Sequence, residues 1–256
     1  MRIGLQLYSV RDKMGEDFEG TLKAVSEMGY ECVEFAGYMD HSAEEIKAIL
    51  DKYNLFAPAV HQKYEFFLED GQKKVDFLKT LGVKYVAIPY IGRECHIGGE
   101  NFETTMKDIK TVSRLLSDNG LKLLYHNHGY ELDTYNGEIL LDSFFETLSS
   151  DIIDAEIDAG WVAYSNVDAC EYLKKYKGRL PLIHVKDFVI EGYDDNGNKN
   201  CKFKPIGKGI LDIPAILKVA AHSGCEYAFV ELEDFSEYAP LDQAKISYDY
   251  LKSLSI

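Results

Sequence analysis

Acidic and histidine side chains recur where four short apolar runs end in the second half of the chain. Glu131 follows the first run, and the next three lead to Asp158, His184 and Glu231, at intervals of 27, 26 and 47 positions. The first two intervals each fit one strand and one helix, and the third fits such a unit with a long loop. Carboxylate and imidazole ligands without a thiolate suit Mn²⁺, Mg²⁺, Co²⁺ or Zn²⁺. The pattern indicates a site for one divalent metal ion, although each acid taken singly is more often a helix cap or an ion-pair partner.

The densest polar cluster is Tyr125-His126-Asn127-His128, with Glu131 just beyond it. His126 and His128 are two positions apart, so they share one face of a strand. Together with Glu131 they could supply a metal ligand and a group that transfers a proton. In the alternative interpretation, one of the two histidines only hydrogen-bonds the backbone.

His184 and Lys186 also share a strand face, and Val185 points to the other side. A histidine beside a lysine at a strand end suggests a metal ligand next to a group that binds an anion or a carbonyl. Alternatively, His184 is a core residue and Lys186 extends its amine to solvent.

Five more residues are candidates for contact with a polar ligand. Gln6 and Tyr8 occupy one level of the first strand, Glu34 ends the second strand and His61 ends the third. Trp161, the single tryptophan, could stack on a sugar ring or pack beneath a loop.

Short apolar runs alternate with amphipathic stretches along the chain and would position these candidates. Strands are expected at 3–8, 32–35, 56–60, 85–88, 122–126, 154–157, 182–185 and 227–231. Helices are expected near 18–28, 44–53, 71–81, 102–119, 137–148, 167–176, 214–223 and 241–254, with a capping box at Ser42 and Glu45. The stretch 188–212 is expected to be a long irregular loop, with a polar turn cluster at 194–199.

Gly29, Gly82, Gly120 and Gly224 each stand between a helix and the next strand, where glycine fits a left-handed helix C-cap. This recurrence, the eight strands and the length of 256 residues predict one (β/α)₈ TIM barrel domain over residues 1–256, of the α/β class. A doubly wound open sheet is the alternative, but it would usually have fewer strands.

The net charge of −15 disfavours binding to nucleic acid or to an anionic membrane through a general field. The five cysteines are scattered and form no CxxC pair, so a reduced, cytoplasmic compartment is expected. We expect no signal peptide and no transmembrane span, because no apolar stretch is long enough. The motifs of P-loops, dinucleotide-binding folds and serine hydrolases are absent from the sequence.

The chain resembles the xylose isomerase-like TIM barrels, a family often called sugar phosphate isomerases/epimerases. The resemblance covers nearly the whole length. It rests on Ile3-Gly4-Leu5-Gln6-Leu7-Tyr8-Ser9-Val10-Arg11-Asp12, Tyr125-His126-Asn127-His128 with Glu131, Asp158-Ala159-Gly160-Trp161, Gly178-Arg179 before His184-Val185-Lys186-Asp187, Gly207-Lys208-Gly209 with Asp212, and Val230-Glu231.

The resemblance implies one divalent metal ion held by residues of strands five to eight, with Asp158, His184 and Glu231 as ligands. Epimerases of the family usually carry a glutamate at the end of strand five, where this chain has Tyr125-His126, so Glu131 or a histidine would take that place. The implied activity is that of an isomerase or epimerase of a keto-sugar or sugar phosphate, by proton transfer next to a metal-bound carbonyl. Glu131, Glu231, His126 and His128 are the candidates for acid–base catalysis.

Two other functions stay open. This branch is also similar to inosose dehydratases and to enzymes of 3-keto sugars, so a metal-dependent dehydratase or lyase is the first alternative. The second is a non-catalytic carbohydrate-binding barrel. DNA-repair endonucleases share the fold, but the charge of −15 argues against that role. The expected partner is a small sugar, and both a monomer and a homo-oligomer are left open.

Overall fold

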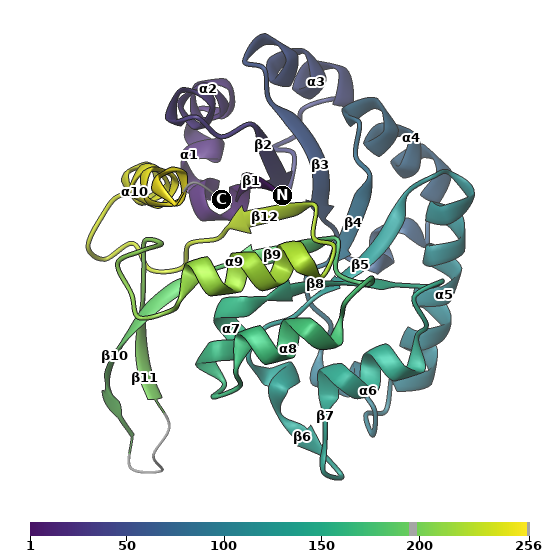
Figure 1. Ribbon diagram of the computed structural model, residues 1–256. Coiled ribbons are helices and arrows are strands. Elements are labelled where there is room, and N and C mark those ends of the chain that lie inside the picture. The colour runs from purple at the N-terminus through teal and green to yellow at the C-terminus, as the bar shows by residue number, and fades with distance from the viewer. Residues whose placement is uncertain (195–198, 255–256) are drawn as a thin grey trace.

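Eight parallel strands close into a barrel, as Figure 1 shows. The computed structural model describes residues 1–194 and 199–254. Around the barrel the strand order is β1-β12-β9-β8-β5-β4-β3-β2, so the last strand closes on the first. The barrel strands are β1 (Arg2–Gln6), β2 (Cys32–Phe35), β3 (Phe56–His61), β4 (Tyr85–Ile88), β5 (Lys122–His126), β8 (Asp154–Asp158), β9 (Leu182–Val185) and β12 (Tyr227–Val230). The predicted TIM barrel is confirmed, and the carboxyl ends of all eight strands meet at one rim.

The first strand is shorter than predicted. It ends at Gln6, and Tyr8 lies in the 3-10 turn η1 (Leu7–Val10), so the prediction that both residues lie on the strand is wrong for Tyr8. The Gln6 side chain accepts a hydrogen bond from the backbone N–H of Tyr8 at 2.9 Å and caps this turn. Gln6 is therefore buried inside the barrel, whereas Tyr8 is half-exposed at the rim.

Helices surround the barrel (Figure 1) and bury their apolar faces against it. The local signals expected at their ends are present. Ser42 and Glu45 form the capping box, and Gly29, Gly82 and Gly224 have positive φ angles of 111°, 82° and 98°. The helices are α1 (Arg11–Glu16), α2 (Phe18–Met28), α3 (Ala43–Lys52), α4 (Gly71–Leu81), α5 (Phe102–Asp118), α6 (Leu140–Thr147), α7 (Ala159–Tyr164), α8 (Ala169–Lys175), α9 (Ile213–His222) and α10 (Pro240–Ser253). Within residues 1–194 and 199–254, none of them is long and apolar enough to cross a bilayer.

An apolar floor fills the barrel on the side away from the rim. Phe229 lies in this floor, and a Cβ atom at Gly4 would come within 2.4 Å of its ring, so strand β1 can approach Phe229 only with glycine there. The floor consists of Cys32, Ala59, Tyr85, Ala87, Leu124, Leu182 and Phe229. The interior turns polar between this floor and the rim.

The stretch after β9 contains a β-hairpin instead of the predicted irregular loop. Strand β10 (Asp187–Tyr193) pairs antiparallel with β11 (Lys199–Lys204), and the hairpin projects from the barrel in Figure 1. Phe203 of β11 packs edge-on against Trp161, with ring centroids 5.0 Å apart. The turn cluster predicted at 194–199 falls largely on residues 195–198, which lie outside the described residues. A second, shorter hairpin of β6 (Thr134–Tyr135) and β7 (Glu138–Ile139) leads into α6.

Candidate metal centre

Alternating residues at the ends of neighbouring strands place several polar side chains inside the barrel. Strand β8 carries Glu156 and Asp158, and β9 carries His184, with Lys186 just beyond its end. The backbone pairing sets Asp158 level with His184, and Glu231 follows the last residue of β12. The pleat of the sheet turns residues two apart to the same side. Regular sheet geometry therefore brings these side chains together.

Four of the side chains lie close enough to share one cation. One ligand atom from each of His126, Asp158, His184 and Glu231 lies within 4.8 Å of the others, and all four residues are buried. Nδ1 of His184 is 2.8 Å from Oε2 of Glu231. The structure thus brings together three of the four predicted ligands, and the fourth member of the group is His126.

Glu131 does not join this group. It is buried in the 3-10 turn η4 (Tyr130–Leu132), where Oε1 accepts a hydrogen bond from the Tyr125 hydroxyl at 2.8 Å. Its Oε2 accepts the backbone N–H of His128 at 2.9 Å, and burial raises the pKa of Glu131 to about 7. Both oxygens serve the turn after β5. The carboxylate of Glu131 is thus held by the turn and lies outside the group, and His126 is the member of the group that comes from strand five, among the alternatives that the sequence left open.

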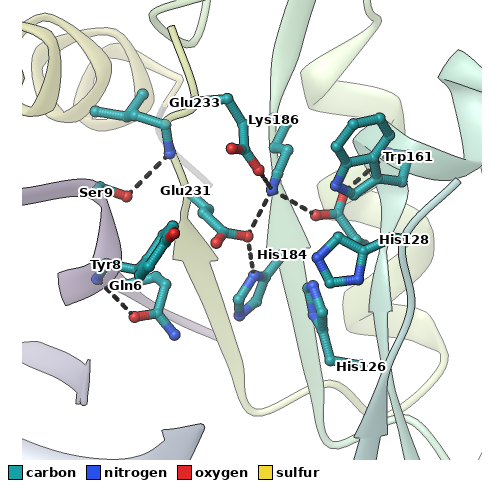
Figure 2. A network of polar contacts seen from close by, with 12 residues as sticks. Gln6, Tyr8, Ser9, His126, His128, Trp161, His184, Lys186, Glu231 and Glu233 are labelled. Atoms are coloured by element: carbon teal, nitrogen blue, oxygen red, sulfur yellow. Dashed lines mark hydrogen bonds and ion pairs between the residues drawn. The ribbon is translucent and has the colours of Figure 1, made fainter. Parts of the chain in front are cut away.

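Lys186 is a buried cation held by carboxylates. Its amine donates to Oε2 of Glu231 at 2.6 Å and to Oε1 of Glu233 at 2.7 Å, and it lies 3.1 Å from Oδ2 of Asp158. Figure 2 shows the amine between Glu231 and Glu233, with Trp161 on the far side. Burial alone would lower the pKa of Lys186, but the neighbouring carboxylates outweigh it and raise the pKa, so the amine stays charged. Lys186 therefore points into the site, as predicted, and does not extend its amine to solvent.

The same contacts set the charge of the carboxylates. Burial would raise the pKa of Glu231, yet Lys186 and His184 lower it well below its ordinary value. Burial raises the pKa of Asp158 to about 6 despite the nearby amine. Asp158 also caps α7, because Oδ1 accepts the backbone N–H of Trp161 at 2.9 Å. Asp158 can therefore cap the helix and also bind a metal ion. Oδ1 makes the cap, and Oδ2 faces the other side chains of the group.

A second set of buried charged groups contacts His184. Nε2 of His184 lies 2.7 Å from Oε2 of Glu34 and 3.1 Å from Oε1 of Glu156. Nε2 of His61 lies 2.9 Å from Oε2 of Glu156, and the His61 ring stacks on His184 at a centroid distance of 5.0 Å. Gln6 donates to Glu34 at 2.7 Å. Gln6 and Glu34, predicted to contact a ligand, are buried, and Glu34 contacts His184 while Gln6 contacts Glu34, so both help to orient His184.

The histidines of the site differ in charge. Burial, together with the neighbouring His184 and His61, lowers the pKa of His126 well below its ordinary value. Burial would lower the pKa of His184 as well, but the carboxylates Glu156, Glu231 and Glu34 raise it well above that value. A neutral imidazole at His126 and ionised carboxylates around it are the forms that bind metals.

The donor set fits a divalent metal ion. Nδ1 of His126 is buried and makes no hydrogen bond within the described residues, whereas Oδ2 of Asp158 is buried with the Lys186 amine as its ion-pair partner at 3.1 Å. An unsatisfied buried nitrogen such as that of His126 is costly unless something else pairs with it. Imidazole and carboxylate ligands without a thiolate suit Mn²⁺, Mg²⁺, Co²⁺ or Zn²⁺. An overlapping, deeper set of His61, His126, Glu156 and His184 meets the same distance limit.

A cavity of about 420 Å³ opens above the cluster. Of the predicted site residues, Tyr8, His61, His126, His128, Trp161 and Glu231 line it. Burial lowers the pKa of His128 to about 4, so its ring is neutral near pH 7. The volume falls in the range of small-ligand pockets.

The sequence prediction missed Glu156 and Glu233. Glu156 stands two positions before Asp158, and Glu233 two positions after Glu231. The rule that grouped His184 with Lys186, that residues two apart share a strand face, would have found both.

The chain is a closed parallel barrel with a histidine and carboxylate cluster at its carboxyl rim, which is where enzymes of the TIM barrel class have their active sites. Within that class, the chain belongs to the xylose isomerase-like TIM barrel family, whose sequence model matches residues 22–254.

Individual relatives are more distant. An inosose dehydratase of Mesomycoplasma hyopneumoniae is 24% identical over 268 residues, which cover 93% of this chain and 88% of the relative. A sugar phosphate isomerase/epimerase from Parabacteroides distasonis superposes with a TM-score of 0.80 at 21% identity, covering 98% of this chain and 93% of that one. A xylose isomerase-like TIM barrel protein from Mycobacterium smegmatis, solved in complex with magnesium, gives 0.68 at 15% identity over 94% and 88% of the two chains. At these identities the structural likenesses show the fold alone.

Proposed function

We propose that the chain is a divalent-metal-dependent isomerase or epimerase of a keto-sugar or sugar phosphate. The observation that carries this proposal is the convergence of His126, Asp158, His184 and Glu231 beneath a cavity of about 420 Å³. The magnesium complex of the M. smegmatis family member adds support. These four residues would hold the cation, and when bound it would act as a Lewis acid that polarises a substrate carbonyl.

Two residues of the cavity wall are suited to move a proton next to that carbonyl. Glu233 lines the cavity, and the charged amine of Lys186 holds its Oε1 at 2.7 Å. His128 lines the wall from the end of β5, and its lowered pKa leaves a neutral ring that can accept a proton. Enolisation requires a base within reach of the substrate C–H bond, and that base, once protonated, can return the proton at the neighbouring carbon. We therefore assign proton transfer to Glu233 and His128, and the fixing of Glu233 to Lys186.

A second candidate function is dehydration of a keto-inositol or 3-keto sugar. The curated relative is named inosose dehydratase and aligns over most of both chains, which favours this candidate. Elimination begins with the same removal of a proton next to the carbonyl. The group that takes this proton, Glu233 or His128, would then be the acid that returns it to the departing hydroxyl, which leaves as water.

The test is solvent-deuterium exchange into a panel of keto-sugars and scyllo-inosose, with added Mn²⁺. We expect deuterium at the carbon next to the carbonyl, and loss of exchange when the metal is removed. Asp158→Asn should lower the exchange rate by about a hundredfold or more, because it removes a proposed ligand. Asp154→Asn is the matched control, since Asp154 lies at the opposite end of the same strand, near Lys122.

The products separate the candidate functions. An isomeric sugar supports the isomerase or epimerase, and loss of water from scyllo-inosose supports the dehydratase. Exchange that continues unchanged without metal would contradict both. Tight sugar binding with neither metal nor turnover would favour the non-catalytic carbohydrate-binding barrel.

A further inference from the structure

A second cavity adjoins the one above the metal centre. Its volume is about 750 Å³, larger than the inner cavity of about 420 Å³. Three side chains line both cavities: Tyr90, His128 and Trp161. The outer cavity continues from this shared wall toward the turn after β5, the end of α7 and the start of β11. A ligand seated at the metal centre could therefore extend past these three side chains into the outer space.

Aromatic rings form much of the outer wall. Tyr90 lies against Tyr130 with ring centroids 5.6 Å apart, and Trp161 lies against Tyr164 at 5.1 Å. Tyr90 is 47% exposed, so a large part of its ring is free to receive a ligand. Aromatic faces offer large apolar area at fixed positions, which suits the C–H face of a sugar ring.

Two polar groups at the shared wall lack a hydrogen-bond partner among the described residues. The indole Nε1–H of Trp161 and Nδ1 of His128 are buried and make no hydrogen bond within the described part of the chain. Buried polar groups of this kind normally find a partner. Sugar hydroxyls and a glycosidic oxygen would supply partners for a donor and for a neutral imidazole.

Both cations that line the outer cavity are hydrogen-bonded, but only Arg93 is paired with a carboxylate among the described residues. The guanidinium of Arg93 donates to Oδ2 of Asp133 at 2.6 Å. The amine of Lys199 donates to the backbone carbonyl of Ala163 at 3.3 Å. Phosphate sites usually present uncompensated arginines or lysines to the anion. The described lining leaves one lysine without an acidic partner, which is less than the group of free cations typical of a phosphate site, and its aromatic area favours an uncharged ring.

We propose that the outer cavity binds a second, uncharged sugar ring, so that the substrate is a keto-sugar glycoside rather than a free monosaccharide. The inference rests on the proposed function, because it seats the keto-sugar part of the ligand at the metal centre. The inner cavity takes the ring that reacts, and the outer cavity holds the attached ring between aromatic side chains.

The test is calorimetric binding to the Mn²⁺-loaded protein. The probes are fructose, four disaccharides that end in fructose but differ in linkage (turanose, lactulose, leucrose and isomaltulose), and fructose 6-phosphate. Ser165 lines only the outer cavity, and its hydroxyl donates to the Gly129 carbonyl at 3.2 Å. Ser165→Phe should fill the outer cavity, and Ser165→Ala is the matched control that removes only the hydroxyl.

At least one disaccharide should bind about tenfold more tightly than fructose, as expected for stacking of one more ring. Ser165→Phe should abolish this gain and leave fructose binding unchanged, and Ser165→Ala should retain the gain. The inference is overturned if fructose binds but no disaccharide gains, if only fructose 6-phosphate gains, or if the gain survives Ser165→Phe. Should fructose itself fail to bind, the proposed function is in question, whereas disaccharide binding that Ser165→Phe removes would still support the outer cavity.

Discussion

At the scale of single residues, the site is a balance of buried charges. Asp158 and Glu231 are buried carboxylates, and Lys186 supplies the cation that lies between them. Removing one member of a buried ion pair leaves the other charge desolvated and uncompensated, which costs far more than loss of a surface pair. Lys186 therefore stabilises the folded protein as well as positioning Glu233.

Replacing Lys186 tests this balance. Lys186→Met keeps the apolar stem but removes the charge, so we expect a loss of about 3–5 kcal/mol in the free energy of unfolding without metal. Mn²⁺ should recover part of the loss, because a divalent cation would again compensate the carboxylates. Urea unfolding with and without Mn²⁺ measures both effects. Lys174→Met, which breaks an exposed pair with Glu171, is the control and should cost about 1 kcal/mol or less. Equal stability of Lys186→Met and the unchanged protein in the absence of metal would contradict this account.

A histidine away from the site makes the fold sensitive to acid. His96 is buried, and burial lowers its pKa from 6.5 to about 4. The unfolded chain therefore binds this proton more readily than the folded protein does. The stability contributed by neutral His96 is complete above pH 6.5 and is lost as the pH falls toward 4, by on the order of 3 kcal/mol.

His96→Phe removes this titration. As the pH falls from 6.5 to 4, we expect the free energy of unfolding of the unchanged protein to fall relative to that of the variant. Urea unfolding at several pH values measures this difference. A difference that stays constant over that range would show that His96 has no such role.

Sequence reasoning was strongest for residues whose partners lie on regular strands. Asp158, His184 and Glu231 fall at strand ends, so the barrel itself brings them together. Sequence reasoning could not choose between Glu131 and a histidine at strand five. The turn after β5 directs the Glu131 carboxylate to Tyr125 and the His128 amide, and short turns leave no periodic pattern in a sequence.

At the scale of elements, the strands could be predicted because each is a short apolar run enclosed by the barrel and helices. The hairpin β10–β11 could not, because it leaves the barrel and most of its residues are only partly buried. Its base is held by Asp187, whose carboxylate accepts the backbone N–H groups of Gly207, Gly209 and Leu211 at 2.9–3.1 Å. One buried carboxylate thus organises the loop that follows the hairpin.

Asp187→Ala should release this loop. We expect faster hydrogen exchange at the amides of Gly207, Gly209 and Leu211, and a loss of about 2–3 kcal/mol in the free energy of unfolding, because these three donors and the N–H of Phe188 lose a charged acceptor. Exchange followed by NMR, with urea unfolding, measures both. Glu191→Gln, an exposed change on the same hairpin, is the control. Unchanged protection of these three amides would contradict the assigned role of Asp187.

At the scale of the whole molecule, the residues that pack the core and the residues of the candidate site lie in different parts of the barrel. Its apolar floor, which includes Phe229 and Leu124, closes one end, and the histidine and carboxylate cluster lies toward the rim. The net charge of −15 includes carboxylates buried in this cluster, and a bound divalent cation would offset part of that charge. Binding of the metal should therefore stabilise the whole fold by mass action.

The most direct test of the central claim is a crystal structure of the protein grown with Mn²⁺, with data collected for anomalous scattering. The account predicts one strong anomalous peak enclosed by the side chains of His126, Asp158, His184 and Glu231, and its loss in Asp158→Asn crystals. A map without a peak at this cluster, or with manganese bound only elsewhere on the protein, would contradict the account.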